Sequence, residues 1–367
     1  MKPLIIGDLI APIPIVQGGM GIGISLSALA SAVASQGGIG VIAAAGIGML
    51  ERDGRVNYQE ASIRRLRQEI RLARSKTSGI LGVNIMMALT NFEELVKTSI
   101  DEGIDIIFAG AGLPFDLPKI VGKDCKAKLV PIISSAKAAN LIIKIWWNKY
   151  QYLPDAFVVE GPKAGGHLGF REDQIIHPDY QLESILPQVL KEINLIKDQL
   201  GHNIDIPVIA AGGIFTGKDI FDILSLGASG VQMASRFVTS EECDASIDFK
   251  NAYIQAKKDD IGIIQSPLGL PGRAIINDFL AQVQDSKKTP NICPYHCIKP
   301  CDYKTSPYCI GLALVNAKNG KFKGGFAFAG ANAYKATKIQ PIKEIFDELK
   351  NEYAQAANNN ENAQKLA

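Results

Sequence analysis

The chain has 367 residues, of which 47% are hydrophobic and 21% are charged, and its formal net charge at pH 7 is +2. This is the composition of a soluble globular protein, and a charge so close to zero gives no reason to expect a nucleic acid or a membrane as partner. The first residues have no apolar core of signal-peptide length, and no apolar run reaches membrane-spanning length. We therefore expect a cytoplasmic location, in which the six cysteines are reduced.

Eight short apolar segments alternate with helical patterns in the first 240 residues. The predicted strands cover residues 12–16, 39–43, 81–85, 104–108, 129–133, 156–159, 207–211 and 230–234. This alternation predicts a mainly parallel sheet, and eight units is the number that closes a (β/α)8 TIM barrel of the α/β class. In the competing open, doubly wound sheet, the first turn carries Gly-x-Gly-x-x-Gly, a spacing that Gly19, Gly21 and Gly23 do not keep.

The pattern changes after the eighth predicted strand. Short helical pieces are followed by a stretch rich in Pro, Cys and Lys over residues 287–310, a glycine-rich run over 320–330 and a helix near 342–353. We expect a barrel over residues 1–240 and a helical, Cys-rich extension over 241–356 that forms a lid or small subdomain. Residues 357–367 are of low complexity and are predicted to be a disordered tail.

The loop after the sixth predicted strand carries one imidazole among four glycines. Residues 156–159 form the apolar strand, and the loop contains His167 together with glycines at 161, 165, 166 and 169. A histidine at the carboxyl end of a buried strand lies where a barrel keeps its chemistry. The alternative is a turn that needs its glycines, with the histidine bonded to its own backbone.

The loops after the seventh and eighth predicted strands are also built of glycine and other small residues. Bare backbone N–H groups and a helix N-terminus suit an anion, so these loops predict a phosphate site, although glycines that merely make tight turns are the alternative. The mouths of the first, third and fifth strands add small residues and amides that suit a broad planar ring with polar edges. A phosphate at one end and a flat ring across the mouth describe flavin mononucleotide, FMN.

Taken together, segments 17–21, 82–84, 160–169, 210–214 and 230–237 resemble the nitronate monooxygenase family, which includes the flavin-dependent enoyl-acyl-carrier-protein reductases. The resemblance implies an FMN-dependent oxidoreductase that binds its cofactor noncovalently at the barrel mouth. It implies that His167 is catalytic and lies over the flavin or the substrate. The cofactor-binding residues that we expect are Gln17, Gly18, Gly19, Met20, Asn84, Lys137, Glu160, Gly165, Gly166, Ala211, Gly212, Gly213, Gln232, Met233, Ala234 and Ser235.

Four of the six cysteines fall within seventeen residues, at Cys293, Cys297, Cys301 and Cys309. Thiolates bind zinc or an iron–sulfur cluster, and the absence of the C-x2-C knuckle favours the cluster while leaving zinc open. His296 is an alternative ligand or a solvated loop residue. The remaining two, Cys125 and Cys243, are expected to be buried small hydrophobes.

A cysteine-bearing extension on this barrel resembles the iron–sulfur decanoyl-acyl-carrier-protein dehydrogenase/isomerase subgroup of unsaturated fatty acid synthesis. Segments 131–137, 154–161, 224–237 and 242–244 fit that subgroup, while the last cysteine gap is shorter here. The resemblance implies FMN, a 4Fe-4S cluster held by the four cysteines, and a medium-chain acyl-carrier-protein substrate. Electrons would leave through the cluster toward an acceptor such as O2.

Three other functions stay open at this point. They are oxidation of small nitronates by O2, NAD(P)H-dependent enoyl reduction, for which the sequence has no nicotinamide fingerprint, and a structural zinc knob for partner binding. A basic helix face from Arg64 to Arg74, with Lys287 and Lys288, either docks an acidic carrier protein or is simply solvated. A homodimer is compatible with the sequence.

Overall fold

The computed structural model describes residues 1–122, 124–201, 205–285 and 289–366. Eight parallel strands form one sheet in the order β3-β11-β10-β8-β7-β6-β5-β4. Their bounds are β3 (Ile15–Gln17), β4 (Gly40–Ala43), β5 (Leu81–Met86), β6 (Ile106–Gly110), β7 (Lys128–Ile133), β8 (Phe157–Glu160), β10 (Val208–Ala211) and β11 (Gly230–Met233). A parallel bridge between Val16 and Ile39 joins the two ends of the sheet, so the predicted TIM barrel is confirmed.

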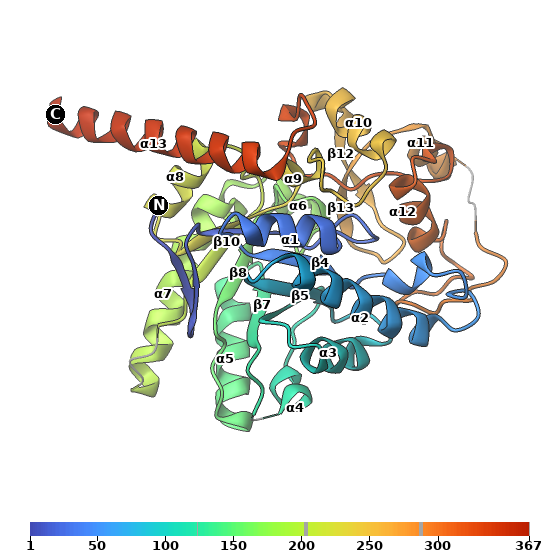
Figure 1. Ribbon diagram of the computed structural model, residues 1–367, viewed down its shortest axis with the longest axis horizontal. Coiled ribbons are helices and arrows are strands. Elements are labelled where there is room, and N and C mark those ends of the chain that lie inside the picture. The colour runs from blue at the N-terminus through green and yellow to red at the C-terminus, as the bar shows by residue number, and fades with distance from the viewer. Residues whose placement is uncertain (123, 202–204, 286–288, 367) are drawn as a thin grey trace.

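Helices surround the barrel (Figure 1). Those that follow the first seven strands are α1 (Ser27–Ser35), α2 (Tyr58–Lys76), α3 (Phe92–Asp101), α4 (Leu117–Val121), α5 (Ala136–Tyr150), α7 (Leu182–Leu200) and α8 (Gly217–Ser225). The place of the eighth helix, between α8 and α1, is taken by α13 (Ile342–Leu366) from the far end of the chain. The barrel is therefore completed by residues well beyond 240.

The same helix corrects the expectation for the tail. Residues 357–366 form the end of α13, where the sequence predicted disorder. The tail has low complexity, but its residues from Ala357 to Leu366 include no proline and no glycine, so nothing in them breaks the helix that the preceding turns have started.

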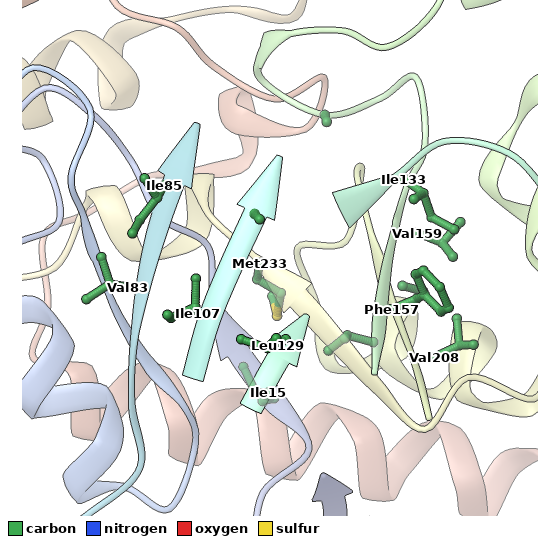
Figure 2. Close-up of a cluster of buried hydrophobic side chains, with 14 of the residues drawn as sticks. Ile15, Val83, Ile85, Ile107, Leu129, Ile133, Phe157, Val159, Val208 and Met233 are labelled. Carbon is green, nitrogen blue, oxygen red and sulfur yellow. The ribbon is translucent and has the colours of Figure 1, made fainter. Parts of the chain in front are cut away.

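Two apolar layers hold the barrel together. Alternate strand residues such as Val41, Phe108 and Val158 meet inside the barrel, and Leu4 and Ile6 join them from a hairpin, β1 (Leu4–Ile6) and β2 (Leu9–Ala11), that closes its amino-terminal end. The other strand residues pack outward against the helices, and Figure 2 shows part of this layer, with Ile15, Val83, Ile107, Phe157 and Met233 among its members. A strand that is buried on both faces consists of a continuous run of apolar residues, which explains why the eight strands could be predicted from the sequence.

The extension between β11 and α13 lies beside the barrel mouth. A hairpin of β12 (Ile261–Gln265) and β13 (Pro271–Ile275) pairs with β9 (Gly166–His167), and so joins the extension to the loop after β8. The remaining helices are α6 (Glu172–Ile175), α9 (Ser235–Val238), α10 (Ile247–Gln255), α11 (Asp278–Asp285) and α12 (Ile310–Lys318), and short 3-10 turns lie at Ile47–Leu50, Pro178–Tyr180, Lys258–Asp260, Phe322–Gly324 and Ala333–Lys335. Among the helices of the described residues, none is both long and apolar enough to cross a membrane.

Candidate active site at the barrel mouth

His167 is held over the mouth by main-chain pairing. In the register of β9 with β13, His167 lies opposite Gly272 and Gly166 lies opposite Arg273, and Gly166 takes a φ of +83° that a side chain would strain. The imidazole Nε2 lies 2.7 Å from Ser266 Oγ, and the Phe328 ring packs 5.1 Å from the imidazole. The histidine is therefore bonded to a side chain of the extension, and the alternative of a histidine bonded to its own backbone is not what the structure has.

Burial shifts the pKa values of two titratable groups at this end of the barrel. Loss of solvent lowers the pKa of His167 to about 4, since the protonated imidazolium is the charged form. Loss of solvent raises the pKa of Glu160, the last residue of β8, to about 7. Near neutral pH the imidazole is therefore uncharged and able to accept a proton, and the Glu160 carboxyl is close to its midpoint.

The first, third and eighth barrel strands bring several predicted residues together. A Cβ on Gly19 would lie 2.4 Å from Asn84 Cβ, and a Cβ on Gly18 would lie 3.4 Å from Ala234 Cβ and 3.5 Å from Gln232 Cγ. These positions form one surface on which a Cβ at residue 19 could not be added without displacing Asn84. Glycine at residue 19 therefore lets the main chain approach the Asn84 side chain this closely.

Other predicted cofactor residues have side chains that point elsewhere. Gln17 is fully buried, and its Oε1 accepts from the Val41 N–H at 3.0 Å, so its amide ties two strands of the barrel wall. Met233 is buried in the layer between strands and helices. The main-chain N–H of Met20 donates to Ser25 Oγ at 2.9 Å, and Lys137 is exposed on the first turn of α5.

The loops after β10 and β11 meet as the sequence predicts, and the extension joins them. Gly212 and Gly213 take φ values of +99° and +84°, directly after Ala211 at the end of β10. Ser235, the first residue of α9, accepts from the Gly330 N–H at 3.0 Å, and the Asn332 side-chain amide donates to the Gly213 carbonyl. A Cβ on Gly165 would lie 2.6 Å from the main chain at residues 329 and 330.

The extension contains functional candidates that sequence reasoning missed, namely Ser266 and Phe328 beside His167, and Gly330 and Asn332 at this junction. The glycine-rich run over residues 320–330 was a visible signal for two of them. In the first turn of α8, Thr216 and Asp219 form a capping box and the Gly217 N–H donates to the Glu352 carboxylate, so these N–H groups are already used. An anion at this place would rest on the glycine loops and on the short α9.

The four clustered cysteines line one cavity of about 170 Å3 within the extension, together with Tyr295 and His296. All four are free thiols, and burial, followed by the charges of the other three, raises the pKa of Cys297 to about 12. The cavity is tied to the barrel at the loop after β5, where the Thr90 N–H donates to the Cys297 carbonyl at 3.2 Å. Four thiols are a donor set that suits zinc or an iron–sulfur cluster.

The arrangement of these side chains is not a closed coordination shell. Across the described residues, no three or more His, Cys, Asp or Glu side chains are placed to hold a metal ion. His296 is exposed and packs its ring 6.2 Å from the Tyr303 ring. Of the two separate cysteines, Cys243 is buried and Cys125 is half-buried.

The basic face of α2 is neutralised by carboxylates of the same chain. Arg67 and Arg71 both pair with Glu102, at 2.8 and 2.6 Å, and Arg74 pairs with Asp105 at 2.7 Å. The other two arginines of this face pair with Glu51, Asp53 and Glu69. This helix is therefore not a free cationic surface, and Lys287 and Lys288 lie outside the described residues.

Comparisons with known proteins agree with this geometry. The sequence model of the family described as nitronate monooxygenase matches residues 3–352. A probable nitronate monooxygenase of Staphylococcus aureus is 29% identical over 310 residues, covering 74% of this chain and 77% of that one. One from Staphylococcus saprophyticus is 30% identical over 196 residues, covering 53% of this chain and only 50% of the relative.

A third relative is named for a different activity. The (3aS,4S,5R,7aS)-5-hydroxy-7a-methyl-1-oxo-octahydro-1H-indene-4-carboxyl-CoA dehydrogenase of Mycobacterium tuberculosis is 28% identical over 276 residues, covering 75% of this chain and 66% of that one. Among solved structures, FabK from Thermotoga maritima superposes with a TM-score of 0.73 at 25% identity, covering 96% of both chains. A nitroalkane oxidase from Streptomyces ansochromogenes, 23% identical, shares the fold with a TM-score of 0.71 over 95% of this chain and 97% of its own. The chain belongs to the nitronate monooxygenase family of FMN-dependent oxidoreductases.

Proposed function

We propose that the protein dehydrogenates and isomerises a medium-chain acyl thioester of the decanoyl type, carried on acyl carrier protein. His167 is the acid–base residue of the proposed reaction. The observation that carries this assignment beyond the family is the cavity lined by Cys293, Cys297, Cys301 and Cys309. A nitronate oxidase that works with O2 has no need of four thiols around one space.

The residues at the mouth fit FMN. Gly212, Gly213 and Ser235 would hold its phosphate, because glycine main chain at φ values of +99° and +84° can turn N–H groups toward an anion, and Gly19 with Asn84 would lie against its ring. When bound, FMN supplies a two-electron oxidant for the substrate. The four cysteines would hold a 4Fe-4S cluster, which supplies one-electron transfer, or alternatively zinc, which does not.

The residues of the chain would handle the protons. The carbon next to a thioester carbonyl is a weak carbon acid, and a neutral imidazole beside it can accept its proton. The Phe328 ring, packed 5.1 Å from the half-buried imidazole, limits the access of water to this transfer. After releasing that proton, the same imidazole can take a proton from the γ-carbon and return it at the α-carbon, which moves the double bond from position 2 to position 3.

Oxidation of a small nitronate by O2 is the second candidate, and it is supported by the names of the staphylococcal relatives. It needs the flavin site and His167 but not the cysteines. Enoyl reduction by NAD(P)H is suggested by the likeness to FabK, and a structural zinc knob by the cysteines alone. O2 as acceptor, a cytoplasmic location and a homodimer stay predictions.

Anaerobic purification followed by an absorption spectrum and assays for iron and acid-labile sulfide tests the proposal. We expect flavin bands with a broad iron–sulfur shoulder, and loss of flavin absorbance when decanoyl thioester is added without oxygen. Cys297→Ser should remove iron, whereas Cys125→Ser, outside the cavity, should keep it. Zinc in place of iron, or a flavin that nitronate reduces and acyl thioester does not, would refute the acyl assignment.

A further inference from the structure

The turn of the β12–β13 hairpin carries a serine that touches His167. Ser266 opens this turn: its N–H donates to the Leu270 carbonyl at 3.0 Å, and its carbonyl accepts from the Gly269 N–H at 2.9 Å. The residue is 5% exposed, and its Oγ lies 2.7 Å from His167 Nε2. A buried hydroxyl in a hydrogen-bonded turn holds a fixed position, and the imidazole is fixed with it.

The hydrogen bonds of Ser266 allow two arrangements of this contact. Its Oγ already accepts a hydrogen bond from the Leu268 N–H at 3.2 Å. A hydroxyl oxygen has two acceptor sites and one donor, so a second acceptor site stays free for an Nε2–H. The opposite arrangement, in which Ser266 donates to Nε2, would occupy the Nε2 lone pair and place the imidazole proton on Nδ1.

We propose that Ser266 is a positioning residue that keeps the proton of neutral His167 on Nε2 and leaves Nδ1 as the nitrogen that exchanges a proton with the substrate. The first half of this proposal concerns the resting protein alone, and the second half rests on the proposed function. Within the described residues, the bond to Ser266 is the one hydrogen bond that the structure records for the His167 side chain. Nδ1 is therefore available to a substrate.

The proton transfer explains why the Nε2–H arrangement suits the task. When Nδ1 takes the α-proton, the substrate C–H bond breaks, an N–H bond forms, and the electron pair stays on carbon and spreads into the thioester carbonyl. The imidazole becomes positive, and its existing Nε2–H···Oγ bond becomes charge-assisted without any ring rotation. In the opposite arrangement Nε2 has no proton to share, and Nδ1 has no lone pair to receive one.

Neighbouring charges do not take over this role. Arg273, on β13, directs its Nη2 to the Pro162 carbonyl at 2.8 Å, and Glu160 ends the adjoining strand β8. Burial is the cause of the lowered His167 pKa, with no charged group contributing to it. The aromatic face is covered by Phe328, which offers no acceptor in the ring plane. Ser266 is left as the group that can stabilise the imidazolium.

The direct test is nitrogen NMR of the FMN-loaded protein with 15N-labelled histidine. The chain has four histidines, and the His167 signals are assigned by their loss in His167→Gln. At pH 7 we expect a protonated Nε2 and an unprotonated Nδ1. A neutral ring with its proton on Nδ1 would overturn the proposal, whatever the substrate of the protein proves to be.

Kinetics test the second half. Ser266→Ala should lower kcat by about 10- to 100-fold, the range set by losing one hydrogen bond to a charged group, with little change in KM or in FMN affinity. The acid limb of the kcat/KM profile should move to lower pH, and Ser266→Thr should restore it. Gln265→Ala, which removes the neighbouring bond to Glu172, is the matched control and should behave as wild type. An unchanged pH profile in Ser266→Ala would overturn the positioning role, whereas no turnover of acyl thioester by the wild type would refute only the proposed function.

Discussion

Asp244 offers a sharp test of how the extension supports the barrel mouth. The helix α1 follows the loop of Gly18 to Gly23, and its N-cap residue, Leu26, has no side chain that can cap it. Asp244 supplies the missing cap from 218 positions further along the chain. Its Oδ2 accepts from the Leu26 N–H at 2.8 Å and from the Leu29 N–H at 3.3 Å.

The magnitude follows from these two bonds. Asp244→Ala leaves two partly buried N–H groups without an acceptor, and a lost cap with an unsatisfied donor costs about 2–4 kcal/mol of unfolding free energy. Burial raises the pKa of the Asp244 carboxyl, so its negative charge opposes folding while its hydrogen bonds favour it. Asp244→Asn keeps an acceptor without the charge and should therefore cost less than about 1 kcal/mol.

Thermal unfolding of the FMN-loaded variants measures the difference. For a chain of 367 residues, the Ala variant should unfold about 3–5 °C below wild type, and the Asn variant within about 1 °C of it. Asp259→Ala, an exposed carboxylate on the same extension, is the control and should have no effect. If Asn were as damaging as Ala, the charge rather than the acceptor would be what α1 requires, and the reasoning would be wrong.

Three further predictions concern the mouth and the surface. Because the folded pKa of His167 is about 4 against an ordinary 6.5, the unfolded chain binds more protons between those values, and wild type should lose about 3 kcal/mol of stability as pH falls through this window. Urea unfolding at pH 7 and pH 4 should show a smaller loss for His167→Gln, and equal losses would contradict the assignment. Gly213→Ala should weaken FMN binding, measured by fluorescence, because residue 213 has a φ of +84° that alanine adopts only with strain. Gly201→Ala is the control: its φ is +66°, and a Cβ there would meet no atom within 4 Å. This variant should cost similar backbone strain and leave FMN affinity unchanged. Arg71→Gln should leave the unfolding temperature close to that of wild type and KM for a carrier-bound substrate unchanged, because Arg71 is paired with Glu102 on the surface. A tenfold rise in KM would restore this helix as a docking face.

Several parts of the site could be found from the sequence because they directly follow a strand. His167 follows β8, Gly212 and Gly213 follow β10, and Ser235 follows β11, so parallel strands bring them to one rim. Asn84 was identified on the same ground, and it lies within the carboxyl half of β5. In each case the strand can be recognised from its own residues, and the strand then determines where the functional residue lies.

Other parts depend on which segment packs where. Gln17 and Met233 end two barrel strands at the same rim, yet their side chains are used by the barrel wall and by the strand–helix layer. The arginines of α2 look like a basic surface until Glu102 is seen beside two of them. Ser266 lies 99 positions from His167 and belongs to no pattern that marks it.

The sequence by itself determined the barrel, the family and the rim residues, because a strand buried on both faces is a continuous apolar run and the loop after it has a fixed place. Tertiary structure alone decided that α13 fills the eighth helix position, that Asp244 caps α1, and that the β12–β13 hairpin brings Ser266 to the imidazole. These contacts join segments roughly a hundred or more residues apart. Their partners are chosen by packing and by the need of buried polar groups for hydrogen bonds, neither of which a local pattern records.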